Sequence, residues 1–95
     1  MATYKPIPPA VVDYAVTLSA TWTGADAPYT QDVTVTGLAA TAKIDVGLSS
    51  NASATEYDAA LSAKLHCTAQ AANQITITAF GTKPTVTIPI LVRSI

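Results

Sequence analysis

The sequence predicts an all-β domain, an antiparallel β-sandwich of jelly-roll or immunoglobulin-like type with one short helix. Six segments alternate apolar and polar residues with the two-residue period of a half-buried strand, and turn residues separate them at intervals of about ten residues. The chain has 95 residues, the size of one domain with a single modest core. The expected strands are residues 14–22, 31–37, 43–49, 64–70, 74–80 and 85–94.

The N-terminal segment, residues 1–12, is predicted to be an extended arm that precedes a sandwich formed by residues 13–95. Its three prolines lack backbone donors and favour the polyproline conformation, so it fits poorly in the interior of a sheet. An extended segment has little conformational freedom to lose, which favours docking in a groove on a capsid or a neighbouring subunit. The residues expected to make this attachment are Tyr4, Lys5, Pro6, Ile7, Pro8 and Pro9.

The first three strands each present one apolar face to the expected core. The series in residues 14–22 ends at Trp22, the only tryptophan of the chain. Gly47 lies on the outer face of the third strand, where a glycine indicates a bulge or the close approach of another backbone segment. The residues expected to face the core from these strands are Tyr14, Val16, Leu18, Ala20, Trp22, Val33, Val35, Ile44, Val46 and Leu48.

Residues 50–63 break the strand period and are expected to contain the helix. Ser53 or Thr55 can cap its N-terminus. Glu56 and Asp58 then give the first turn the negative charge that a helix N-terminus favours.

The C-terminal third of the chain is expected to form a hairpin, from residues 64–70 and 74–80, and a last strand at 85–94. Pro89 has no amide hydrogen, so this last strand is predicted to be an edge strand or to contain a bulge. Leu91 shares the outer face with Pro89, and an exposed apolar face of this kind normally marks an interface. The pattern therefore predicts self-association.

Two interpretations of the stretch TWTGADAPYTQDVTVTG, residues 21–37, stay open. Trp22 and Tyr29 could form an aromatic platform for a glycan or a proline-rich peptide. The favoured alternative is a corner of the sandwich, because Trp22 continues the inward series in phase with the strand period. Gly24 would then allow a positive φ and Tyr29 would pack against the corner.

No catalytic or metal-binding constellation is predicted. His66 and Cys67 are adjacent, so in a strand they point to opposite faces and cannot share a ligand sphere. Cys67 is expected to be a buried thiol and His66 a surface imidazole. A zinc set, a nucleophile elbow and a glycine-rich phosphate loop are all missing from the sequence. We therefore expect no enzyme activity, no cofactor and no metal.

The composition argues against nucleic acid and membrane partners. Charged residues make up 12% of the chain, with a net charge of −1, against about 25% charged residues in ordinary soluble proteins. The basic residues are scattered and give no footprint for a phosphate backbone. No apolar run approaches the ~20 residues of a membrane span, and the N-terminus lacks the apolar stretch of a signal peptide, so we expect synthesis and retention in a cytoplasm.

A family resemblance is carried by three stretches in order, WTGADAPYTQDVTVTGL, AKIDVGLS and ATEYDAALSAKLHCTAQAANQITITAFGTKPTVTIPILV. Together they resemble a domain found at the C-terminal ends of fibre, head-fibre and minor structural proteins of phages of Gram-positive hosts. The resemblance covers roughly residues 14–93. Its most specific parts are W-T-G followed by P-Y-T-Q and V-x-V-x-G, and the closing F-G-T-K-P-T.

The resemblance implies a structural protein of the virion, either a capsid decoration or a head-fibre protein, without catalytic activity. Its partners would be a capsid or other virion protein and further copies of itself, as a homotrimer, because fibre domains are commonly threefold. A tail or baseplate fibre adaptor is one alternative. A glycan-binding module for host adsorption, using Trp22 and Tyr29, is the other.

Overall fold

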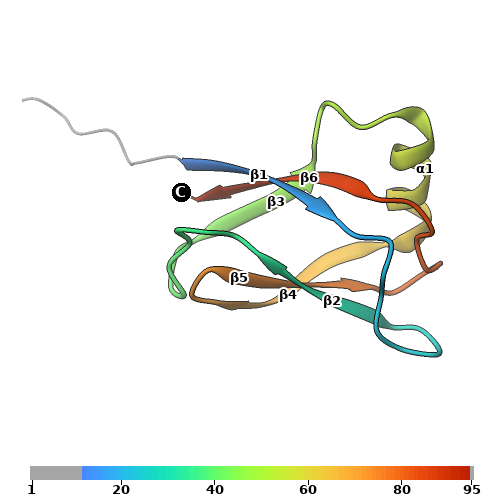
Figure 1. Ribbon diagram of the computed structural model, residues 1–95, viewed down its shortest axis with the longest axis horizontal. Helices are drawn as coiled ribbons and strands as arrows, with labels where there is room; N and C mark the ends of the chain where they lie inside the picture. Colours follow the sequence, from blue (N-terminus) through green and yellow to red (C-terminus); the bar gives the residue numbers. More distant parts are fainter. Residues whose placement is uncertain (1–11, 95) are drawn as a thin grey trace, which may run out of the picture.

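Two antiparallel three-stranded sheets face each other in the computed structural model, which describes residues 12–94 (Figure 1). The predicted class, an antiparallel β-sandwich with one short helix, is therefore confirmed. The proposed attachment arm, Tyr4 to Pro9, lies outside the described residues. The elements are β1 (Val12–Leu18), β2 (Tyr29–Thr34), β3 (Ile44–Leu48), α1 (Ala54–Ala63), β4 (Leu65–Ala71), β5 (Gln74–Ala79) and β6 (Ile88–Ser94).

The strand order is β1-β6-β3 in one sheet and β2-β5-β4 in the other. Strands that follow one another from β1 to β4 alternate between the sheets, and the pairs β1–β6 and β2–β5 are nested. This order is jelly-roll-like, because an immunoglobulin sandwich places its first two strands side by side in one sheet. β1 and β2 adjoin on one side of the sandwich, so β3 and β4 form the edges of the two sheets on the other side.

The core lies between the sheets and is built mainly on the two central strands, β5 and β6. Their inward residues alternate with outward ones, as the two-residue period predicts. Leu38, in the loop after β2, and Ala63, at the end of α1, close the core at its two ends. The buried apolar residues are Leu18, Trp22, Val33, Val35, Leu38, Ala63, Ile75, Ile77, Ala79, Ile88, Ile90 and Val92.

The prediction that Pro89 marks an edge strand or a bulge is wrong, because β6 is the central strand of its sheet and pairs regularly on both sides. The Pro89 carbonyl accepts a hydrogen bond from the Ser49 amide at 3.0 Å, just beyond the end of β3. In such a pair a residue with an amide hydrogen at position 89 would also donate to the Ser49 carbonyl, which proline cannot do. The Ser49 carbonyl instead accepts from the Ala52 amide at 3.1 Å, so the missing donor leaves no unpaired acceptor there.

Gly47 also differs from its prediction. It pairs in register with Leu91, and a Cβ atom at this position would meet no atom within 4 Å. The bulge of the sandwich lies instead in β4, between Cys67 and Ala69. Glycine therefore gave a misleading signal, because its effect in a strand depends on neighbours that the local sequence does not specify.

β1 ends at Leu18, four residues before the predicted end at Trp22. From Ser19 the chain crosses toward the second sheet, where Gln31 of β2 holds it. The Gln31 side chain accepts from the Ser19 amide and donates to the Ser19 carbonyl, both at 3.0 Å. The side-chain amide of Gln31 thereby replaces the backbone hydrogen bonds that β1 loses where the chain crosses between the sheets.

The helix α1 has the N-terminus that the sequence predicts. The Ser53 hydroxyl accepts from the Glu56 amide at 3.2 Å, and the Glu56 carboxylate accepts from the Ser53 amide at 2.7 Å, which is a capping box. At the other end Lys64 adopts the left-handed conformation, and the amide of Gly81 donates to the carbonyl of Ala63 at 2.8 Å. The loop after β5 therefore holds the C-terminal end of α1.

The predicted hairpin of β4 and β5 is confirmed. Its turn contains Asn73 in the left-handed region, with φ 61°, a conformation that asparagine tolerates. The Asn73 side chain accepts from the Gly37 amide at 2.8 Å, and its backbone exchanges bonds with Val35 and Leu38. The loop after β2 is thereby tied to the tip of the hairpin.

Candidate functional site

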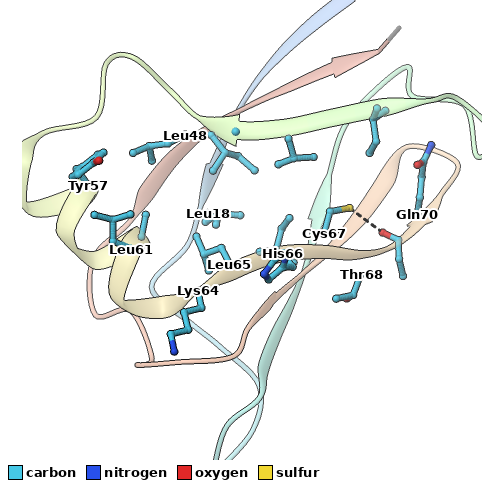
Figure 2. Close-up of a pocket in the computed structure, with 17 residues that line it drawn as sticks. Leu18, Leu48, Tyr57, Leu61, Lys64, Leu65, His66, Cys67, Thr68 and Gln70 are labelled. Carbon is cyan, nitrogen blue, oxygen red and sulfur yellow. Dashed lines mark hydrogen bonds between the residues drawn. The ribbon is translucent and has the colours of Figure 1, made fainter.

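A groove of about 720 Å³ lies between β3 and β4, with α1 at one end (Figure 2). This volume is in the range of small-molecule and peptide sites, which is roughly 300–1,000 Å³. We call it the edge groove. Its walls are formed by the inner faces of the edge strands β3 and β4 and by α1, and its floor is formed by core residues between the two sheets. The walls include Ile44, Val46, Leu48, Tyr57, Leu61, Leu65, Cys67 and Gln70, and the floor includes Leu18, Ile77 and Ile90.

The edge groove exists because β3 and β4 have no described neighbour on their outer sides. On the opposite side of the sandwich β1 adjoins β2, but here the two sheet edges do not meet. Ile44, Val46 and Leu48, which the sequence places in the core, are in consequence only half-buried. Figure 2 shows Leu48 from above and Leu65 from below turned toward the space between the strands.

The prediction that Cys67 is a buried thiol is wrong. Cys67 does lie on the inner face, in register with Ile77, but β4 is an edge strand and its inner face opens into the edge groove, so the thiol is exposed. Partial desolvation by the groove walls raises the pKa of the Cys67 thiol above its usual value. A thiol with a raised pKa is mostly protonated at neutral pH and is a poor nucleophile.

His66 is exposed, as predicted. It pairs with Thr78 and Cys67 pairs with Ile77, so the two follow opposite phases of the strand, although His66 also borders the edge groove. The His66 ring contacts Phe80 edge to face, with 5.6 Å between the ring centroids. Within residues 12–94, no three or more His, Cys, Asp and Glu side chains come together in a way that could hold a metal ion. The described part of the chain also contains no helix long and apolar enough to cross a membrane.

Trp22 and Tyr29 do not form a surface platform. Trp22 is only 6% exposed, so its ring faces are not available for stacking on a sugar, and its position fits the alternative of a corner residue. Gly24 in this corner has φ 123°. Tyr29 is half-buried, and the ammonium of Lys83 lies 5.6 Å from the centre of its ring. Of the two candidate glycan contacts, Tyr29 alone is more than slightly accessible.

A charge cluster on the outer face of the first sheet was not predicted. Arg93 of β6 donates to both carboxylate oxygens of Asp13 of β1, at 2.8 and 3.3 Å, and Asp45 of β3 lies across from it in register. The hydrogen bond from Arg93 lowers the pKa of the Asp13 carboxyl. The only signal in the sequence was the opposite charge of these residues, and their pairing depends on the strand order.

The exposed apolar side chains lie elsewhere than predicted. Leu91, expected on an exposed face, is half-buried. The large exposed apolar residues of the described part of the chain are instead Tyr57 and Leu61 on α1, at the end of the edge groove, Phe80 beside His66, and Val12 at the start of β1, with exposed fractions of 51%, 60%, 50% and 43%. Two of these four residues line the edge groove, and none belongs to β6.

Comparisons with protein-family models, with curated proteins and with solved structures give no match for this chain.

Proposed function

We propose that this chain is a structural protein of a phage virion, a capsid decoration or head-fibre protein, and that residues 3–10 attach it. The proposal rests on the sequence motifs through which residues 14–93 resemble C-terminal domains of phage virion proteins, and the two-sheet fold is compatible with it. A small β domain with a binding groove and a preceding Pro-rich segment fits a role in assembly.

The placement of the N-terminal segment supports this role. β1 begins at Val12, beside Ser94 at the end of β6. This end of the sandwich lies opposite the end that carries α1 (Figure 1). Attachment through residues before Val12 would leave the end with α1 directed away from the attachment point, which suits a domain displayed on a particle.

We propose in addition that copies of the chain associate with one another as a homotrimer. The exposed apolar residues Tyr57 and Leu61, at the end of the edge groove, support association, because apolar surface of this kind tends to be buried in interfaces. The low content of charged residues acts in the same direction. The threefold order comes from the resemblance to fibre domains.

The proposal is tested on purified particles of the phage that encodes the chain. Mass spectrometry should detect the chain as a stoichiometric component, and its absence from particles would contradict the proposal. Deleting residues 1–10 should leave a folded sandwich, checked by circular dichroism, and abolish incorporation. Normal occupancy of the truncated chain would show that the anchor lies on the sandwich itself.

A glycan array separates the alternative role. Sugar binding that is lost on Tyr29→Ala, in a chain absent from capsids, would favour host adsorption over decoration. A tail or baseplate adaptor would instead be found in particles and be located at the tail.

A further inference from the structure

We propose that the edge groove binds residues 3–10 of a second copy of the chain, with the Ile7 side chain seated beside Val46. The inference deepens the proposed function by naming the acceptor of the Pro-rich segment, and it rests on the self-association proposed above. Exchange of this segment would build the oligomer, so residues 3–10 would attach the chain to the particle through the oligomer and not by contacting the capsid themselves.

The first support is the free backbone edge of β3. The Ser49 amide donates to Pro89 of β6, and backbone groups of successive residues in a strand point to alternate sides. The backbone amides and carbonyls of Ser49, Gly47 and Asp45 therefore point toward β6. Those of Val46 and Leu48 point away from it. No residue within 12–94 pairs with this outer edge. Unpaired edges of this kind are the usual place where an extended segment adds to a sheet.

The second support is the spacing of donors in the Pro-rich segment. In an extended strand Lys5 and Ile7 offer their amides on one edge, where Pro9 offers its carbonyl alone, and the opposite edge carries Pro6 and Pro8, which have no amide hydrogen. From Lys5 to Pro9 such a strand therefore donates on one side only, and there it ends the sheet without creating a new donor edge. The two-residue spacing of Lys5 and Ile7 equals that of the free groups on β3.

The third support is the match of side chains. In an antiparallel pair, residues directly opposite each other point to the same face. Ile7 opposite Val46 therefore enters the edge groove, whose walls are mostly aliphatic and whose one charged lining residue is Lys64. Lys5 then lies opposite Leu48. Its stem can cover the apolar surface of α1 while its ammonium stays in water.

Geometry favours a second copy over the same chain. β1 lies at the far edge of its sheet from β3, with β6 between them. A segment that leaves β1 at Val12 would have to reverse to reach its own groove. Residues 1–11 contain no Gly, Asn, Asp or Ser, which supply the positive φ or the side-chain hydrogen bonds of many tight turns, and successive prolines favour the extended polyproline conformation. They would span up to about 36 Å when extended, enough to reach a neighbouring molecule.

The test uses the full chain and two lysine substitutions. Ile7→Lys and Leu61→Lys should each raise the dissociation constant of the oligomer by at least about tenfold, which corresponds to about 1.4 kcal/mol. Phe80→Lys is the matched control, because Phe80 is 50% exposed and Leu61 60% exposed, but Phe80 does not line the edge groove. Light scattering over a range of concentrations measures the association, and circular dichroism verifies the fold. If Leu61→Lys disturbs folding, the result for Ile7→Lys decides the test, because residue 7 precedes the sandwich.

Cys67 provides a second readout, because it is the one cysteine of the chain and lines the edge groove. Its reaction with a small aromatic disulfide should slow as the protein concentration rises, and Ile7→Lys should remove this dependence. A monomeric mass at all concentrations would overturn the inference. So would an oligomer that Ile7→Lys leaves unchanged, or Cys67 protection that is independent of concentration, which would place the segment in its own groove. Because no particles are used, these outcomes are separate from the failure of the virion role.

Discussion

Replacing Gly81 by Ala should destabilise the domain, because the backbone at Gly81 lies against the C-terminal end of α1. Gly81 donates to the Ala63 carbonyl at 2.8 Å, and Thr82 donates to the Ser62 carbonyl at 3.0 Å. A Cβ at position 81 would overlap the Ser62 carbonyl oxygen, a backbone atom that cannot move unless the helix moves. Overpacking of this kind costs about 1–3 kcal/mol. Weakening the two hydrogen bonds adds about 0.5–1.5 kcal/mol each.

The expected loss is therefore about 2–6 kcal/mol, which for a domain of this size lowers the melting temperature by at least about 8 °C. Thermal unfolding followed by circular dichroism measures it. Gly47→Ala is the matched control, because a Cβ there meets no atom within 4 Å and alanine in a strand is favoured over glycine by about 0.5–1 kcal/mol. Equal melting temperatures for Gly81→Ala and the parent protein would refute the close approach, and with it the placement of α1 beside the edge groove.

Three further predictions concern single side chains. The pKa of Asp13 is lowered, so its stabilising contribution is complete above the unfolded value of about 3.9 and is lost as pH falls through the folded value. Asp13→Asn should therefore lose less stability than the parent between about pH 5 and pH 2, and equal losses would contradict the ion pair. Trp22 should emit with the blue-shifted fluorescence of a buried indole, unaffected by added sugars, whereas a sugar-dependent shift would restore the platform. Because the pKa of Cys67 is raised, its alkylation rate should reach half-maximum above about pH 8.5, the ordinary thiol value, and a lower midpoint would indicate an activated thiol.

Local patterns carried most of the fold prediction. Alternation identified each strand, since the two-residue period depends only on neighbouring residues. The helix start was predictable because the capping box of Ser53 and Glu56 is local. The hairpin of residues 64–70 and 74–80 was predictable because only three residues separate its two alternating segments. Each of these features is encoded within a few residues of sequence, and each is present in the structure.

The candidate site could not be predicted in the same way, because it depends on which strands pair. Pro89 suggested an edge, yet β6 is central, since the missing donor falls just beyond the end of β3. Cys67 continues an inward series, but its strand is an edge and its thiol faces the edge groove. Arg93 and Asp13 are 80 positions apart in the chain, and only the register of β1 with β6 brings them together. Strand order is non-local information.

Imaging of phage particles with and without this gene product tests the proposed virion role most directly. Particles that lack the chain should assemble with an intact shell and lack a repeated surface density, and complementation with the full chain should restore it at the capsid. Complementation with a chain that lacks residues 1–10 should not. Particles that are identical in the two preparations, with no density lost at capsid or tail, would contradict the proposed role.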